Sequence, residues 1–378
     1  MLPGRASAYH DRVKIVHIEA GRHLYGGARQ VEYLIGGLAM HGVEQVLLCP
    51  PGQPLAARVP AARVLELAMH GDADLGLVPR LMRLLAGLEP DLVHVHSRRG
   101  ADLYGGLAAA LSRVPAVLTR RVDSAEPPAW SRFKYRPYRA VVAISRAVAD
   151  ELAEHAGLAP SLIHVIASAV DAELWRPDPA ARQRLLARFD LAEDDFVLGM
   201  SAQLIARKGH EYAFAAVHSL LGRHPTLRLL CFGRGAMESA LRASLERDGL
   251  GERVRLVGFV DDLDALLPGL DLFVHPALRE GLGLAVLEAM SAGLPIVAAA
   301  AGGLVDAVTD GVEGLLVAPA DAHALARAVE RLLEDPDLRR AMGQAGRARV
   351  VRDFSIAAMS DAYMNLYRAV LGQRHAYV

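Results

Sequence analysis

Short apolar runs of strand length alternate with helical stretches along this 378-residue chain, and the alternation occurs twice. The first series of predicted strands comprises residues 13–19, 46–49, 91–96, 116–119 and 140–145. The predicted helices of this series comprise residues 28–41, 75–87, 101–111 and 146–155. A second series of the same kind begins at Phe196. Strands that alternate with helices predict a parallel sheet with helices on both faces, so we expect two α/β domains.

The length of the chain supports two domains, because one hydrophobic core rarely extends over 378 residues. Hydrophobic residues make up 52% of the sequence, which is enough for two cores. A stretch at residues 163–179 ends in two prolines and is the predicted linker. We therefore place the N-terminal domain at residues 1–175 and the C-terminal domain at residues 190–356.

Charge and cysteine usage narrow the class of protein. The formal net charge is −1, which argues against a bulk nucleic-acid binder. Cys49 and Cys231 lie in apolar, strand-like runs and are predicted to be buried thiols, as in a reducing compartment. No apolar run reaches the roughly 18 to 20 residues of a membrane span, and the first twelve residues lack the apolar core of a signal peptide. We expect a cytoplasmic protein.

One strand, loop and helix in the second half predict a binding site. Residues 271–276 are an apolar strand, Gly281 and Gly283 form a tight loop, and helical spacing begins at Leu284. Such a loop directs backbone N–H groups and the positive end of the helix dipole at one point. The expected ligand is therefore an anion.

Two carboxylates accompany this loop. Glu280 precedes the glycines, and Glu288 follows in the helix. A carboxylate repels phosphate but accepts hydrogen bonds from vicinal hydroxyls, so sugars on either side of a phosphate would suit the site. This pattern predicts a nucleotide sugar. The alternative is an ordinary strand-loop-helix unit with surface glutamates.

The same residues carry a family resemblance. Glu280 and Glu288, separated by seven residues, resemble the signature of retaining GT-B glycosyltransferases of family 4, the glycosyl transferases group 1. Further motifs follow in the family's order at residues 258–262, 292–296, 302–306 and 310–317. The resemblance implies two Rossmann-like parallel α/β domains that face each other across a cleft, the first for the acceptor and the second for the donor. It also implies that a final helix, at about 357–378, packs back onto the N-terminal domain.

The resemblance implies a role for each matching residue of the second domain. Lys208 would bind the donor diphosphate, Glu280 would face the transferred sugar and Glu288 would hold the ribose. Other donor-binding candidates are Gly233, Val260, Leu282, Gly283 and Leu284. The family's phosphate-binding arginine is replaced by Gln203, which is neutral. Arg207 either supplies that missing charge or points to solvent.

In the first domain, Gly26 and Gly27 precede a helix, where the family's glycine loop faces the donor phosphates and the acceptor. A tight turn is the alternative. Arg121 stands about where the family often has a histidine, which indicates an acidic or phosphorylated acceptor. Arg120 and His96 are further acceptor-side candidates, although a lone histidine at a strand end is more often structural.

No metal or other cofactor is expected. Glycosyl transfer expels a nucleoside diphosphate, and some folds stabilise it with a divalent metal held by an Asp-x-Asp pair. This chain has three such pairs, at residues 72–74, 262–264 and 335–337, but none follows a clear apolar strand. We interpret them as acids of loops or helix starts. Cations and helix N-termini would then stabilise the leaving group.

Aromatic and basic residues are interleaved at residues 130–139. This pattern suits a lipid headgroup boundary or an acceptor phosphate. The alternative is a solvated helix. A peripheral contact with the cytoplasmic face of the inner membrane is thus one interpretation.

We interpret the chain as a metal-independent, retaining glycosyltransferase that moves a sugar from a UDP- or GDP-sugar to a glycan or glycolipid. Lipopolysaccharide, capsule or other cell-envelope biosynthesis is the expected context. A transferase that makes a small soluble glycoside is one alternative. A catalytically idle module that binds sugar nucleotides is another.

Overall fold

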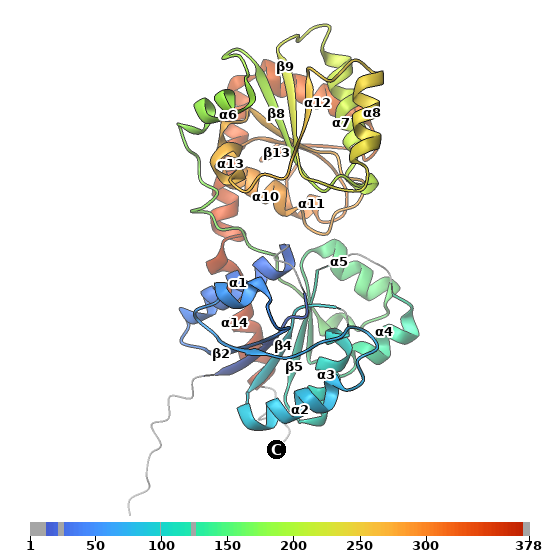
Figure 1. Cartoon of the computed structure of the whole chain (residues 1–378), viewed down its shortest axis with the longest axis vertical. Helices are drawn as coiled ribbons and strands as arrows, with labels where there is room; N and C mark the ends of the chain where they lie inside the picture. Colours follow the sequence, from blue (N-terminus) through green and yellow to red (C-terminus); the bar gives the residue numbers. More distant parts are fainter. Residues whose placement is uncertain (1–12, 22–25, 99, 122–125, 373–378) are drawn as a thin grey trace, which may run out of the picture. The chain divides into compact units, whose positions relative to one another are not determined.

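The computed structural model describes residues 13–21, 26–98, 100–121 and 126–372. Within these ranges the chain forms two compact units. The first unit comprises the described residues up to Ala143, residues 149–166 and the chain from Met359 onward; the second comprises residues 144–148 and 167–358. Figure 1 shows that each unit consists of a sheet and helices.

The sheet of the first unit has seven parallel strands in the order β3-β2-β1-β4-β5-β6-β7. These are β1 (Lys14–Ile18), β2 (Glu44–Cys49), β3 (Arg63–Glu66), β4 (Leu92–Val95), β5 (Ala116–Arg120), β6 (Ala140–Ala143) and β7 (Ile163–Val165). The five strands predicted in this half are confirmed. The sequence missed β3 and β7, which are the two edge strands. The prediction that residues 163–179 form only a linker is therefore wrong at its first three residues, because these pair with β6.

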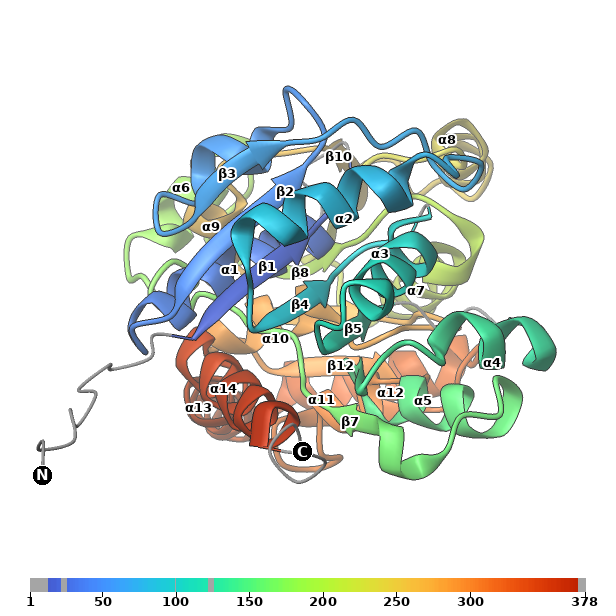
Figure 2. The ribbon, with the colours of Figure 1, turned by 90° about the horizontal axis from the view of Figure 1, so that it is seen from below.

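Helices cover both faces of this sheet. They are α1 (Gly26–Ala39), α2 (Leu77–Leu88), α3 (Ala101–Leu111) and α4 (Pro128–Tyr135). The next helix, α5 (Arg146–Asp150), begins in the second unit, and the π-helical turn that continues it (Glu151–His155) belongs to the first. Short 3-10 turns lie at Pro54–Arg58 and Pro160–Leu162. In Figure 2, α2 and α3 lie side by side, and α3 packs on β4 and β5.

The last helix, α14 (Ile356–Gly372), packs into the first unit from Met359 onward. Its Tyr367 hydroxyl lies 2.6 Å from Nδ1 of His94 on β4, and its Tyr363 hydroxyl lies 2.8 Å from the Thr119 hydroxyl on β5. All four side chains are buried. A C-terminal segment thus completes the core of the N-terminal unit.

The second unit has six parallel strands in the order β10-β9-β8-β11-β12-β13. These are β8 (Phe196–Ser201), β9 (Leu227–Phe232), β10 (Val254–Gly258), β11 (Leu272–His275), β12 (Ile296–Ala299) and β13 (Gly314–Val317). Its helices are α6 (Ala181–Phe189), α7 (His210–Leu220), α8 (Glu238–Arg247), α9 (Leu263–Leu266), α10 (Leu284–Ser291), α11 (Leu304–Ala307), α12 (Ala322–Glu334) and α13 (Pro336–Asp353). Figure 1 shows α7 beside α12, and side chains of both join the apolar core under β8 and β9. The predicted pair of parallel α/β sheets is confirmed.

The strand orders place one switch point in each sheet. The chain adds strands outward from β1 to β3 and then returns to β4, and it repeats this from β8 to β10 and then to β11. In open α/β sheets, the loops after the two central strands diverge at such a point, and ligands bind in the crevice that these loops leave at the carboxyl edge.

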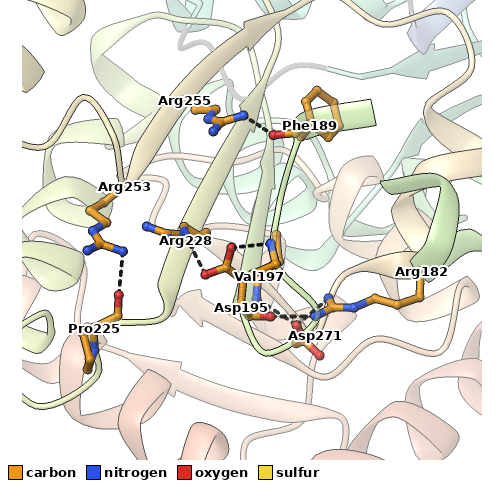
Figure 3. A network of polar contacts seen from close by, with 10 residues as sticks. Arg182, Phe189, Asp195, Val197, Pro225, Arg228, Arg253, Arg255 and Asp271 are labelled. Carbon is orange, nitrogen blue, oxygen red and sulfur yellow. Dashed lines mark hydrogen bonds and ion pairs between the residues drawn. The ribbon is translucent and has the colours of Figure 1, made fainter. Parts of the chain in front are cut away.

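The opposite edge of the second sheet is held together by ion pairs (Figure 3). Arg182 on α6 lies 2.8 Å from Asp271, which also accepts a hydrogen bond from the Val197 amide. Arg228 on β9 lies 2.8 Å from Asp195. These contacts join the amino ends of β8, β9 and β11, so polar residues at this edge stabilise the fold and leave the carboxyl edge for binding.

Both cysteines are free and buried, as predicted. Burial raises the pKa of the Cys231 thiol to about 12. Over the described ranges we found no helix with the length and apolar character that a membrane span requires.

Candidate functional site

Lys208 and Glu280 form an ion pair at the switch point of the second sheet. Lys208 ends a 3-10 turn (Ala206–Lys208) that follows β8, and Glu280 lies in the loop that follows β11. Both side chains are mostly buried. The structure therefore brings together two predicted site residues that are far apart in the sequence.

His275, the last residue of β11, completes this pair. Its Nε2 lies 2.9 Å from the Oε2 atom of Glu280 that Lys208 also contacts. The other oxygen, Oε1, accepts a hydrogen bond of 3.2 Å from the Gly281 amide. The carboxylate thus has partners on both oxygens and a fixed orientation.

These contacts determine the charge of Glu280. Burial raises the pKa of this carboxyl, but the hydrogen bond from His275 and the charge of Lys208 outweigh it and lower the pKa to about 2. Burial, assisted by His275 and Lys208, lowers the pKa of His210 to about 4. At neutral pH the site therefore holds an ionised glutamate beside a neutral His210.

His275 and His210 are functional candidates that the sequence analysis missed. Nδ1 of His275 and Nε2 of His210 are buried and have no hydrogen-bond partner in the described part of the chain. Buried polar atoms without a partner are rare, so these two nitrogens are candidate contacts for a substrate. The signal was available for His275, which ends the apolar strand directly before the glutamate loop.

Glycines shape the loop around Glu280. Gly302 has φ +54°, and a Cβ atom there would lie 2.1 Å from the carbonyl oxygen of Glu280. A Cβ atom on Gly303 would lie 2.1 Å from the carbonyl oxygen of Gly281, and the Gly303 amide donates to the Glu280 carbonyl at 3.0 Å. The backbone of one loop thus packs directly on the other and fixes the position of Glu280.

The loop leads into α10 through Gly283, which has φ +92°. Leu282 and Gly283 are buried, and Leu284 is the first residue of the helix. The first N–H groups of a helix have no partner within it and attract anions. Glu288 lies in the second turn of α10 and is partly buried. Four of the predicted donor residues, Leu282, Gly283, Leu284 and Glu288, thus lie on one loop and the helix that follows it.

A second loop, after β9, packs against the loop after β8. A Cβ atom on Gly233, at φ +139°, would lie 2.0 Å from the Ala202 carbonyl oxygen, and the Leu204 amide donates to the Arg234 carbonyl at 3.1 Å. This contact requires glycine at 233. Val260 follows β10 and is partly buried.

Arg207 and Gln203 differ from Lys208 in burial. Both side chains are exposed, whereas Lys208 is 9% exposed. The backbone carbonyl of Arg207 accepts a hydrogen bond of 2.8 Å from the Leu278 amide, which ties the β8 loop to the β11 loop. The missing family arginine therefore has no buried replacement in the described loops at this edge.

The switch point of the first sheet opens into a cavity of about 380 Å³. Four of the predicted acceptor-side and glycine-loop residues line it, namely Gly27, His96, Arg120 and Arg121. Glu19, Ser97 and Arg98 line it as well. Gly26 begins α1 and is exposed, and the glycine loop before it lies outside the described residues.

Arg120 belongs to a buried charge network. Glu126 lies 2.7 Å from Arg120 and 2.8 Å from Lys134, and Lys134 lies 2.6 Å from Asp102. Burial raises the pKa of Glu126, but Lys134 and Arg120 lower it to about 2. The interpretation of residues 130–139 as one basic surface is therefore wrong in part, because Lys134, Tyr135 and Tyr138 are buried.

Three buried histidines, His17, His94 and His96, lie close enough together to suggest a metal site. However, both ring nitrogens of His94 have hydrogen-bond partners, Tyr367 and Thr119. Both ring nitrogens of His17 are also engaged, by His96 and Gln45. A metal would have to break these bonds, so we regard His17 and His94 as structural.

The Asp-x-Asp pairs have local partners. Asp74 accepts a hydrogen bond from the His70 amide and pairs with Arg80 at 2.6 Å. Asp335 caps α13 by accepting from the Leu338 amide at 2.9 Å, and Asp262 lies at the start of α9. These roles agree with their interpretation as acids of loops and helix starts.

Comparison with known proteins adds a family to this geometry. Residues 182–349 match the family model described as glycosyl transferases group 1, and residues 25–174 match that of glycosyltransferase family 4. The 2-deoxystreptamine glucosyltransferase of Streptomyces kanamyceticus is 31% identical over 303 residues, which cover 75% of this chain and 78% of the relative.

Solved structures of similar fold include a glycosyltransferase from Rickettsia africae. It has a TM-score of 0.87 at 19% identity and covers 96% of this chain and 99% of its own. The Anabaena protein HepE, solved in complex with UDP, has a TM-score of 0.82 at 21% identity and covers 94% of this chain and all of its own, 100%.

Proposed function

Because the chain belongs to glycosyltransferase family 4, with the GT-B fold and a group 1 C-terminal domain, we propose that it transfers a sugar from a nucleotide-sugar donor to a glycan or glycolipid acceptor. The observation that carries this proposal is the Lys208–Glu280 pair at the switch point of the second sheet. The family match gives the class of reaction, and the pair suggests where the donor binds.

The donor diphosphate lies at Lys208 and the N-terminus of α10. An ammonium group and free helix amides both favour a phosphate at this point. Glu280 is ionised and accepts hydrogen bonds from hydroxyls of the transferred sugar. Glu288, further along α10, accepts hydrogen bonds from the ribose. HepE, a protein of similar fold, binds UDP, and this supports a uridine donor.

Transfer requires stabilisation of the departing diphosphate. The bond from the sugar C1 to the phosphate oxygen breaks, and the diphosphate leaves with the electron pair. The acceptor hydroxyl oxygen bonds to C1 on the same face, and its proton passes to the leaving phosphate. Lys208 and the amides of α10 stabilise the developing negative charge, with Arg207 as a second cation. In this mechanism the configuration at C1 is retained and no metal takes part.

The exposed residues of α4 suggest how the chain contacts a membrane that carries a glycolipid acceptor. Trp130 and Phe133 are 46% and 60% exposed, and their rings lie 5.9 Å apart. Arg132 and Arg136 are exposed on the same segment. Exposed aromatic rings flanked by arginines suit the headgroup region of an anionic membrane. We propose peripheral contact at this face, as in cell-envelope biosynthesis on the cytoplasmic side of a membrane.

A small soluble acceptor is the second candidate. The S. kanamyceticus relative is named for transfer of glucose to 2-deoxystreptamine. A vesicle-sedimentation assay separates the two candidates, because only a membrane-contacting transferase loses vesicle binding in the variant Trp130→Ala/Phe133→Ala.

The proposed function is tested by thermal unfolding with UDP, GDP, ADP and their glucose conjugates in the presence of EDTA. A ligand that binds only the folded chain raises the midpoint. We expect the nucleotide and the nucleotide sugar of one base to raise the unfolding midpoint, and we expect no such increase in the Lys208→Met variant. If none of these ligands shifts the midpoint, the donor site proposed here is wrong.

A further inference from the structure

The cavity at the β1/β4 switch point contains polar groups that the fold leaves unpaired. It has a volume of about 380 Å³, within the range of small-molecule pockets. His96, which directly follows β4, and Arg121, which directly follows β5, both line it. Their hydrogen bonding defines what a ligand in this cavity must carry.

A chain of hydrogen bonds fixes the tautomer of His96. Gln45 donates from Nε2 to the Ile35 carbonyl at 2.9 Å, so its Oε1 accepts from Nε2 of His17 at 3.2 Å. Neutral His17 therefore has a lone pair on Nδ1, and this accepts from Nε2 of His96 at 2.9 Å. It follows that Nδ1 of neutral His96 is unprotonated and can only accept a hydrogen bond.

The histidines are neutral at physiological pH. Burial lowers the pKa of His17 to about 4 and the pKa of His96 well below its usual value. Nδ1 of His96 is itself buried and has no hydrogen-bond partner among the residues that the structure describes. An unmade hydrogen bond at a buried acceptor destabilises the folded chain, and a ligand with a hydroxyl group would supply the missing donor.

Among the described residues, Arg121 lacks hydrogen-bond acceptors, whereas His96 lacks a donor. Arg121 follows β5, and two of its guanidinium nitrogens, Nε and Nη2, are buried without a hydrogen-bond partner in the described ranges. Arginine retains its charge in proteins, and a buried charge requires a counterion. Asp102 and Glu126 already pair with Lys134 and Arg120. A third acid, Glu19, lines the cavity and accepts a hydrogen bond of 2.7 Å from the Gly21 amide.

We propose that this cavity binds the acceptor through an anionic group, a phosphate or a carboxylate, on Arg121 and a hydroxyl that donates to Nδ1 of His96. This deepens the proposed function, since only a transferase has an acceptor. It selects acceptors that carry a negative charge next to a free hydroxyl, such as a phosphorylated sugar or a sugar acid. Neutral and cationic sugars leave Arg121 unpaired and bind weakly.

Isothermal titration of the full chain with four probes tests the proposal. The probes are glucose 6-phosphate, glucuronate, neutral glucose and inorganic sulfate at pH 7.5. We expect both charged sugars to bind at least about tenfold more tightly than glucose, because glucose lacks the charge-assisted hydrogen bond to Arg121. Which of the two charged sugars binds more tightly shows whether the cavity prefers a phosphate or a carboxylate. Glucose binding as tightly as both would overturn the proposal.

Variants locate the binding. Arg121→Ala should weaken both charged sugars at least about tenfold, whereas Arg83→Ala, which removes an exposed arginine on α2, should not change them. His96→Ala should weaken glucose 6-phosphate but not sulfate, which has no hydroxyl to donate. Arg121→Lys serves if the alanine variant does not fold. Unchanged binding by a folded Arg121 variant would contradict the proposal.

The donor site is a competing anion site, and Lys208→Met removes it. We expect the charged sugars to bind Lys208→Met with unchanged affinity, because their site is the cavity and not the donor site. If their affinity falls in Lys208→Met but not in Arg121→Ala, the inference is overturned. The two proposals fail separately. If nucleotides bind but the charged sugars do not, only the acceptor inference is wrong. If no nucleotide binds, the proposed function itself is wrong.

Discussion

Replacement of Lys208 by methionine removes a charge from the site while it keeps a side chain of similar length. Lys208 is 9% exposed and pairs with the buried carboxylate of Glu280. Removal of one partner of a buried ion pair costs about 3 to 5 kcal/mol of folding stability. Glu280 retains His275 at 2.9 Å and the Gly281 amide, so we expect the lower end of this range, about 3 kcal/mol.

The same substitution should weaken the donor nucleotide. A hydrogen bond to a charged group contributes about 1.5 to 3 kcal/mol, which corresponds to roughly 10- to 150-fold in Kd. The stability loss and the affinity loss have different origins, because the first arises from the uncompensated Glu280 and the second from the missing contact to phosphate. A second substitution can therefore separate them.

The separating variant is Lys208→Met/Glu280→Gln. It replaces the pair by neutral groups, so most of the lost stability should return while the nucleotide affinity stays low. Urea unfolding measures the stability of each variant, and isothermal titration with the nucleotide chosen by the thermal panel measures Kd. Arg182→Ala, which breaks an ion pair at the other edge of the sheet (Figure 3), is the matched control that loses stability without loss of affinity.

Nucleotide affinity that is unchanged in a folded Lys208→Met variant would refute this reasoning, because the nearest buried cation would then make no contact with the donor. Recovery of affinity in the double variant would also refute it, since the loss would then come from an unpaired glutamate and not from the absent lysine.

Three further predictions concern other parts of the molecule. Gly302→Ala should lower the unfolding midpoint and the nucleotide affinity, because a Cβ atom would lie 2.1 Å from the Glu280 carbonyl at φ +54°; Gly222→Ala, where no atom lies within 4 Å, should change neither. The pKa of His17 is about 4 in the folded chain and 6.5 when unfolded, so below pH 6.5 the unfolded chain takes up a proton that the folded chain takes up only near pH 4. The contribution of His17 to stability should thus fall by about 3 kcal/mol between pH 6.5 and 4 and be constant above pH 6.5. Urea unfolding at pH 7.5 and pH 5 measures this loss, and an equal loss in the native chain and in His17→Gln would contradict the prediction. Transfer measured with and without EDTA should proceed at the same rate, and a loss that magnesium or manganese restores would show that a metal takes part.

The fold could be predicted to a large extent because its central strands are buried on both faces and appear as uninterrupted apolar runs. The runs that became β1, β4, β8 and β11 are of this kind. The edge strand β3 is only partly buried and β7 has three residues, so neither leaves a recognisable hydrophobic pattern. Burial on both faces, and not strand propensity, made the difference.

The positions of the candidate residues were predictable where they follow from local sequence. The glycine loop and the following helix placed Glu280 and Glu288, and the position after a strand placed Lys208. The partners of these groups were not predictable, since His275 and His210 contribute through their distance to Glu280 and Lys208 in the folded chain. Spacing in the sequence does not reveal such contacts.

For the basic stretch at residues 130–139, the sequence pattern likewise did not reveal which residues are buried. Its cations and aromatics look alike in the sequence. In the fold, however, Lys134 pairs with Asp102 inside the first unit, while Trp130 and Phe133 remain exposed. Charge patterning indicates that a surface exists but does not tell which members of the pattern lie on it.

Hydrogen–deuterium exchange of the full chain with and without the nucleotide that raises the unfolding midpoint tests the central claim most directly, because it locates the donor. We predict that amides at residues 202–209 and 281–288, around Lys208 and the start of α10, exchange more slowly when the nucleotide is bound, and that Lys208→Met loses this protection at the same nucleotide concentration. Protection confined to other segments, with these two unchanged, would show that the Lys208–Glu280 pair is not the donor site.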